Sequence, residues 1–336
     1  MANTIALAKK YVPLLDEVYK LAALTGDLES DTELARAGAN TNEIIVPKIS
    51  MDGLADYRRN SGYVSGDVSL TWETVRFNYE RGRKFSVDDM DDEESQNVAF
   101  GKLAGEFIRT KVAPELDAFR FATYCGISGI STVEAAALST GADVIAALRA
   151  AVNTMDEDEV PQDQRYLYIT PTLHNKVKDL DTDKSRDALA GFARIIDVPQ
   201  SRFYTAIKLK DGTTSGETGG GYAKASVEYA LTSDTSVVTG KTYYTLSGST
   251  YSSVASPSDA NLSTYYERTA EAGVNINFLA IHKPAVLQFT KHAVPKIINP
   301  DANPNGDAWI YGYRTYGLAD VYENKVAGIY LHKSTT

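Results

Sequence analysis

The strongest constraint in this sequence is a long helical pattern that covers residues 95–124. Its apolar residues recur at steps of three and four, which is typical of a helix with one buried face. We expect the core of this helix to include Phe100, Leu103, Phe107, Ile108, Leu116 and Phe119. At ~1.5 Å per residue, such a helix would be roughly 45 Å long. Pro114 lies inside it and cannot bond to the carbonyl of Thr110, so the sequence predicts a kink there.

An acidic run precedes this helix, with six carboxylates in the seven positions 88–94. Carboxylates at the start of a helix complement the positive end of its dipole, and Asp92 or Ser95 can cap the free amides. Gly126 follows the last turn, where a left-handed residue is favoured. The helix dipole therefore explains the acidic run better than a metal site does.

Two strand-like segments before the helix share an irregular alternation of apolar and polar residues. In Glu43–Met51, Ile44 and Val46 have one phase, and Ile49 and Met51 have the other. The segment 68–85 changes phase in the same way between residues 73 and 74. A change of phase indicates either a β-bulge or a strand that passes from one environment to another. We expect a long hairpin whose base belongs to its own domain and whose outer half covers something else.

The tip of this hairpin, residues 53–66, combines three glycines with charged and aromatic side chains. A two-stranded ribbon is marginally stable alone, so it needs a partner surface, which we infer to be another subunit. The residues predicted to make this contact are Asp56, Tyr57, Arg58, Arg59 and Trp72. The two arginines are predicted to reach carboxylates of a neighbour, such as those at 88–94. The alternative is a solvated polar tip.

The second half of the chain has the pattern of a compact α/β domain with an insertion. The strand RYLYIT is followed by Pro171 at a helix start, and NINFLAIH by Pro284 and a predicted helix AVLQFTKH. Residues 226–273 are rich in Ser, Thr and Tyr and predict a small β-rich insertion with a hairpin that turns at Gly248. The C-terminal strands, from Trp309 to His332, are expected to return to the first domain and pack on the long helix.

Composition and spacing argue against an enzyme. The net charge of −10 disfavours general affinity for nucleic acid or an anionic membrane, and charged residues interrupt the longest apolar stretch. The single cysteine, Cys125, is interpreted as a buried small residue of a protein that folds in a reducing cytoplasm. The four histidines lack the spacing of a metal site; they are His174, His282, His292 and His332. No catalytic, cofactor or metal motif is predicted. The 21 tyrosines fit either subunit contacts or simple strand preference.

The order of these parts resembles the major capsid protein of tailed bacteriophages, which has the Hong Kong ninety-seven-like fold. The residues that carry the resemblance include SGYVSGDVSLTWETVRFNYERGRKFSVDDMDDEES at 61–95 and VAPELDAFRFATYCG at 112–126. Further similar stretches lie at 198–207, 276–309 and 321–333. They look like coat proteins of siphophages that infect Gram-positive hosts, and the resemblance covers most of the chain apart from the insertion.

The resemblance implies an α+β fold with five parts. They are an N-terminal arm (1–42), an extended β-hairpin loop (43–86), a peripheral domain with a spine helix (87–130 and 300–336), an axial α/β domain (131–225 and 274–299) and the insertion (226–273).

The function implied is a major capsid protein that self-assembles through pentamers and hexamers into the icosahedral head shell. The shell would enclose double-stranded DNA without sequence-specific binding. The expected partners are further copies of the chain, a scaffolding protein, a portal protein and decoration or head-completion proteins, with no cofactor and no membrane. The expected location is the virion, after assembly in the host cytoplasm. The alternative is the shell protein of an encapsulin-like bacterial nanocompartment of the same fold.

Overall fold

The computed structural model describes residues 23–30, 36–37, 42–60, 62–90, 98–135, 138–248, 250–304 and 306–335. Contacts divide the described chain into two compact units. Unit 1 contains Thr25–Ile108 and Val286–Tyr322, and unit 2 contains Arg109–Ala285 and Glu323–Thr336. Most of the predicted N-terminal arm and most of the acidic run, with both predicted caps, lie outside the described residues.

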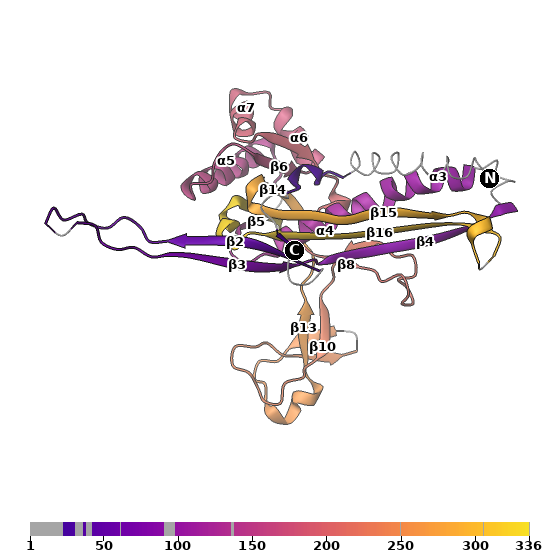
Figure 1. Cartoon of the computed structure of the whole chain (residues 1–336). Helices are drawn as coiled ribbons and strands as arrows, with labels where there is room; N and C mark the ends of the chain where they lie inside the picture. Colours follow the sequence, from indigo (N-terminus) through magenta and orange to yellow (C-terminus); the bar gives the residue numbers. More distant parts are fainter. Residues whose placement is uncertain are drawn as a thin grey trace. The chain divides into compact units, whose positions relative to one another are not determined.

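Unit 1 is built on a sheet of three long antiparallel strands in the order β15-β16-β4 (Figure 1). These strands are β15 (Val286–Ile298), β16 (Ala308–Val321) and β4 (Tyr79–Asp88). Helix α3 (Val98–Phe107) lies against one face of the sheet, where the Phe107 ring is 4.9 Å from Phe85 and 6.1 Å from Tyr313. The other elements of unit 1 are β1 (Arg36–Ala37), β2 (Glu43–Met51), β3 (Val68–Arg76) and the 3-10 turns η1 (Gly26–Leu28) and η7 (Pro300–Ala302).

The helix predicted for AVLQFTKH is wrong, because this segment forms the first half of β15. Residues Val286, Leu287, Gln288 and Phe289 are all buried, so both faces of the strand are covered. An apolar run buried on both faces has no period of two, and it therefore looks like a helix in the sequence. The amide of Gln288 donates to the carbonyl of Thr25, which satisfies its polar group inside the unit.

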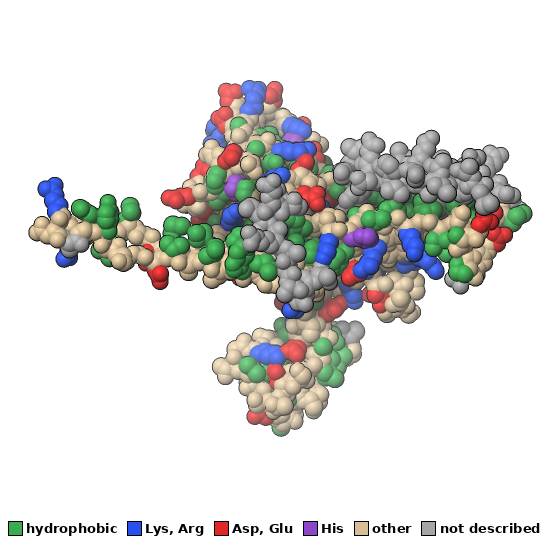
Figure 2. Space-filling model, in the orientation of Figure 1, with side chains coloured by type: hydrophobic (Ala, Val, Ile, Leu, Met, Phe, Trp, Pro, Cys, Tyr) green, Lys and Arg blue, Asp and Glu red, His purple; other side chains and the backbone are tan. Residues whose placement is uncertain are grey.

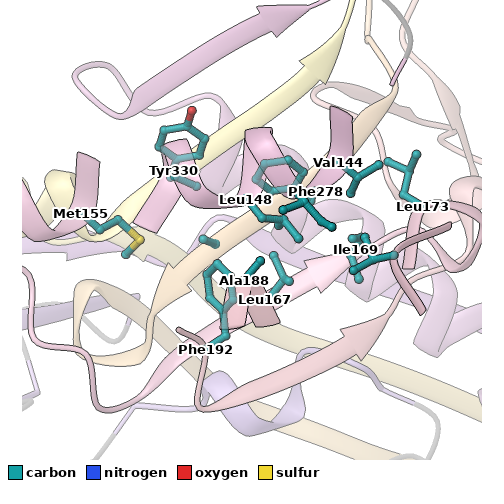
Figure 3. Close-up of a cluster of buried hydrophobic side chains, with 14 residues drawn as sticks. Val144, Leu148, Met155, Leu167, Ile169, Leu173, Ala188, Phe192, Phe278 and Tyr330 are labelled. Carbon is teal, nitrogen blue, oxygen red and sulfur yellow. The ribbon is translucent and has the colours of Figure 1, made fainter. Parts of the chain in front are cut away.

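Unit 2 contains a five-stranded mixed sheet in the order β5-β17-β14-β6-β7. The strands are β5 (Ser131–Ala135), β17 (Ile329–Ser334), β14 (Ile276–His282), β6 (Arg165–Ile169) and β7 (Arg194–Asp197). Its core packs the sheet against helices α5 (Gly141–Glu157), α6 (Pro171–Lys178) and α7 (Asp183–Ala190), with Leu148, Leu167 and Phe278 fully buried between them (Figure 3). A capping box between Thr140 and Asp143 begins α5, and Pro171 begins α6 as predicted.

The last strand was predicted to join the first domain, and the structure places it elsewhere. β16 does pair in the sheet of unit 1, but β17 lies between β5 and β14 in the sheet of unit 2. The turn η8 (Glu323–Gly328) separates the two strands, and η6 (Lys283–Ala285) marks the other passage between the units. The chain therefore passes between the units at 108–109, 285–286 and 322–323.

The long helix is present from Val98 to Cys125, but its middle is a π-helical turn, Ile108–Val112, that ends just before Pro114. A π turn inserts one residue, which rotates the following helical face by roughly 100°. The π turn contains Thr110, to whose carbonyl Pro114 cannot bond, and the kink at Pro114 stays a prediction. In α4 (Ala113–Cys125), the fully buried aromatic residues are Phe121 and Tyr124, while Phe119 is half-buried.

The insertion folds as a small four-stranded antiparallel sheet in unit 2, in the order β10-β13-β11-β12. The strands are β10 (Glu228–Leu231), β13 (Tyr266–Ala270), β11 (Tyr244–Ser247) and β12 (Thr250–Ser253), preceded by η4 (Gln200–Arg202) and the hairpin β8 (Ile207–Leu209) with β9 (Tyr222–Lys224). Gly248 turns the β11–β12 hairpin with φ +63°, as predicted. Its core combines Tyr243, Tyr265 and Leu262, the last from the 3-10 turn η5 (Asp259–Thr264).

We predict that unit 2 loses stability in mild acid because of His332. This side chain is buried, stacks on Phe278 at 4.8 Å and accepts a hydrogen bond at Nδ1 from Asn277 Nδ2. Burial lowers the pKa of His332, so the folded state keeps it neutral while the unfolded chain takes up a proton below about pH 6.5. The free energy of unfolding should therefore fall as the pH drops from about 8 to about 5.5.

Denaturant unfolding of the wild type, His332→Gln and the surface control His292→Gln at both pH values measures this effect. His332→Gln should lose less stability in acid than the other two proteins. Half-buried His282, whose pKa burial also lowers, leaves a residual slope in all three. Equal acid sensitivity of the wild type and His332→Gln would contradict the prediction.

Candidate assembly surface on the β2–β3 ribbon

Strands β2 and β3 form a ribbon without a bulge, and the short strand β1 pairs with β2 at its base, so that only the outer half is two-stranded. Their register is continuous from Glu43↔Arg76 to Met51↔Val68. Of the two explanations for the change of phase, the structure therefore excludes the bulge within this pair. The apolar residues instead move from one face of the ribbon to the other between residues 46 and 47.

The base of the ribbon uses one face to pack on its own unit. Ile44 and Val46 are buried against Leu287, Phe289 and Leu318 of β15 and β16. This half of the ribbon thus shares the core of unit 1, as the sequence predicts.

The outer half carries its apolar residues on the opposite face, as three cross-strand pairs. We call this the outer apolar face: Pro47 with Trp72, Ile49 with Leu70 and Met51 with Val68. Ile49 and Leu70 are 55% and 56% exposed, so nothing in the described chain covers them. The reverse side carries Lys48, Ser50, Ser69 and Thr71. Figure 2 shows the apolar side chains following the projecting ribbon. A contiguous apolar face of this kind, with a polar reverse, indicates a protein–protein contact.

The tip of the ribbon is ordered by its own short contacts. Asp52 Oδ2 accepts a hydrogen bond from the Asp67 amide at 2.8 Å, and Arg58 and Gly62 exchange two backbone hydrogen bonds. The rings of Tyr57 and Tyr63 lie 4.9 Å apart.

The structure places the predicted contact residues Asp56, Tyr57, Arg58 and Arg59 together at the exposed tip. Trp72 lies farther back, on the outer apolar face, and is 47% exposed. No ion pair joins Arg58 or Arg59 to any residue that the structure describes, so their contact with a neighbour's carboxylates stays a prediction. The prediction missed the aliphatic members of the outer apolar face, although the change of phase had placed them on one side.

The predicted core residues of the long helix are only partly brought together. Ile108 and Leu116 are buried, whereas Leu103, Phe107 and Phe119 are half-buried. The side chain of Phe100 lies outside the described part of the chain. The π turn rotates the helical face before α4, where Leu116 stays buried but Phe119 does not.

The described residues were compared with the requirements of a metal site and of a membrane span. They contain no cluster of His, Cys, Asp and Glu able to hold a metal, and no described helix has the length and apolar character needed to cross a membrane. Cys125 is partly buried and desolvation raises the pKa of its thiol, which disfavours the reactive thiolate. Among the histidines, His174 bonds to Asp197 at 2.6 Å and His292 is exposed.

Comparison with solved structures identifies the fold. The chain is similar to the capsid structure of the cyanophage P-SCSP1u, with a TM-score of 0.51, 12% identity and coverage of 90% of this chain and 86% of that chain. It also matches a chain of Mycobacterium phage Che8, with a TM-score of 0.47, 13% identity and coverage of 91% of this chain and 89% of that chain. A chain of a virus-like particle from Pyrococcus furiosus matches with a TM-score of 0.49, 10% identity and coverage of 96% of this chain and 98% of that chain. No protein-family model and no curated protein matches the sequence. The likeness to the cyanophage chain shows the fold: a mixed α+β, Hong Kong ninety-seven-like capsid fold.

Because only one face of the ribbon is buried, the same substitution should lower the free energy of unfolding of the isolated subunit much more on that face than on the other. Ile44→Ala removes a side chain that is 8% exposed and should lower the free energy of unfolding by about 3 kcal/mol. Ile49→Ala, in the same strand, should change it by less than about 0.5 kcal/mol. Denaturant unfolding of both variants measures the difference, and a large loss for Ile49→Ala would show that its face is already buried in the subunit.

Proposed function

We propose that this chain is the major capsid protein of a tailed bacteriophage, and that copies of it build the icosahedral head shell around double-stranded DNA. The observation that carries the proposal is the outer apolar face, which a subunit with this capsid fold leaves exposed. Burying its half-exposed side chains against a neighbour would contribute on the order of 5 kcal/mol per ribbon. A subunit that keeps such a face uncovered is built for association.

The contact is heterologous, since the ribbon of one copy meets a different surface of the next. Heterologous contacts close into rings when the rotation between copies fits, as in pentamers and hexamers. Every copy then packs its ribbon on one neighbour and is contacted by the ribbon of the other, so modest contacts add up around each ring. At the tip, the charges of Asp56, Arg58 and Arg59 and the ring of Tyr57 would set the register of the contact.

The finer assignments rest on the sequence stretches that resemble siphophage coat proteins of Gram-positive hosts. They include that host type, a scaffolding protein during assembly, a portal protein and decoration or head-completion proteins. The division into peripheral, axial and insertion domains belongs to the same proposal, with β15 assigned to the unit of the spine-helix N-terminal half and β17 to the axial sheet. An encapsulin-like nanocompartment is the alternative, and it predicts shells filled with protein cargo instead of DNA.

The test is shell assembly by the full chain, expressed with and without a candidate scaffolding protein and imaged by electron microscopy. We expect closed shells from the wild type. Ile49→Asp with Leu70→Asp should abolish them, because it puts charge on the outer apolar face. The matched control Ser50→Asp with Ser69→Asp changes the reverse side by the same charge and should still assemble.

Both variants should unfold like the wild type, which separates lost assembly from lost folding. A wild type that stays monomeric at high concentration with scaffold present would overturn the proposal. Equal assembly of the two variants would remove the outer apolar face from it.

A further inference from the structure

The sheet of unit 1 has a second exposed face, opposite α3, that is rich in cations. Register places Lys296, Gly312 and Lys84 in one row across β15, β16 and β4, and Val294, Arg314 and Gly82 in the next. We call this the basic face: Lys84, Lys291, His292, Lys296 and Arg314. In Figure 2, Lys, Arg and His side chains gather over the stretch where these strands run.

Two cations of the basic face lack an internal partner. Arg314 pairs with Glu80, and Lys291 lies over the Phe77 and Tyr316 rings at 5.1 and 5.8 Å. Lys84 and Lys296 are exposed and form no ion pair within the described chain. In a protein with a net charge of −10, this concentration of cations indicates a surface for an anionic partner.

Gly312 opens a slot between those two lysines. Strands lie about 4.8 Å apart, so the backbones of Lys84 and Lys296 are roughly 10 Å apart with no side chain between them. A Cβ at Gly312 would meet its nearest atoms only at 3.8 and 3.9 Å, which is ordinary contact, so folding does not require glycine here. A glycine inside a strand leaves space in which a ligand or another backbone can approach closely.

The same sheet ends in carboxylates. Asp88 closes β4 opposite Ala308, and Asp301 and Asp307 lie in the loop between β15 and β16. We call Asp88, Asp301 and Asp307 the acidic end. All three are exposed, and none forms an ion pair with a described residue.

Within one subunit, no ion pair joins the acidic end to the basic face in the described part of the chain. Asp88 and Lys84 share a face of β4 and are four residues apart, or roughly 13 Å along the strand. Both groups of charges are therefore available to another copy of the chain.

We propose that the basic face docks the acidic end of a second copy of this chain, with a carboxylate of Asp301 or Asp307 seated over Gly312 between Lys84 and Lys296. Asp301 belongs to the 3-10 turn η7 and Asp307 directly precedes β16, and both side chains are exposed. This inference rests on the proposed shell function and adds a second contact, distinct from the ribbon, between copies.

Charge exchange tests the pairing in the same co-expression assay. The face variant is Lys84→Glu with Lys296→Glu, and the end variant is Asp301→Lys with Asp307→Lys. Each should raise the protein concentration needed for shells by about tenfold, because attraction becomes repulsion. The combined four-residue variant restores opposite charges and should assemble near the wild-type concentration. Lys178→Glu with Lys184→Glu, on α6 and α7, is the matched control for net charge.

A neutral variant tests the slot separately. Gly312→Gln has room for its Cβ, should unfold like the wild type, and should weaken assembly by filling the space between the lysines. Thermal unfolding of every variant checks that the subunits fold.

The outcomes separate this inference from the proposed function. If the wild type forms shells and the face variant forms them equally well, the pairing is wrong and the shell function stands. If the face variant fails and the combined variant does not recover, the partner of the basic face is not the acidic end. A wild type that forms no shells removes the shell function itself.

Discussion

The central constraint in this structure is the point along the ribbon at which its apolar side chains stop packing on their own unit. Up to Val46, the apolar residues of β2 point at β15 and β16 and hold the ribbon to its unit. From Pro47 onward, the same strand in the same register points its apolar residues the other way. A two-stranded ribbon has too little internal contact to be stable alone, so its outer half depends on a second surface. One shift in phase thus separates the residues that stabilise the fold from those that are available for assembly.

The sequence was sufficient to predict an element where the spacing of its apolar residues had a single physical cause. The two arms of the ribbon, the strand before Pro171 and the hairpin at Gly248 were predicted because turn chemistry and alternation agreed there. AVLQFTKH was misassigned because a strand buried on both faces has no period of two. Phe121 was missed because the π turn rotates the helix by one residue, and no residue type marks that turn before Pro114. The placement of β17 depends on long-range pairing with β14 and β5, which local patterns do not contain.

The insertion shows how a small sheet folds with few apolar residues. Lys241 lies between Asp234 and Glu267, at 2.7 Å from Asp234 Oδ2, and the Tyr243 hydroxyl donates to the same carboxylate. The hydrogen bonds that Lys241 donates to Asp234 and Glu267 raise the pKa of Lys241. The hydrogen bonds that Asp234 accepts from Lys241 and Tyr243 lower the pKa of Asp234. Lys241 and Asp234 are therefore both charged near neutral pH. Tyr229 and Tyr251 stack at 4.0 Å on the sheet. Many of the chain's tyrosines therefore serve packing within the insertion, which favours the strand-preference explanation for this segment.

Charge and apolar contact act on association in opposite ways. With a net charge of −10, two copies repel each other at long range, and salt weakens this repulsion. The outer apolar face acts only at contact and is insensitive to moderate salt, whereas attraction between the basic face and the acidic end is screened like the repulsion. Added salt therefore favours the ribbon contact and disfavours the charged one. Assembly that relies on both contacts should have an optimum at intermediate ionic strength. At low salt the repulsion between copies opposes association, and at high salt the attraction between the basic face and the acidic end is lost.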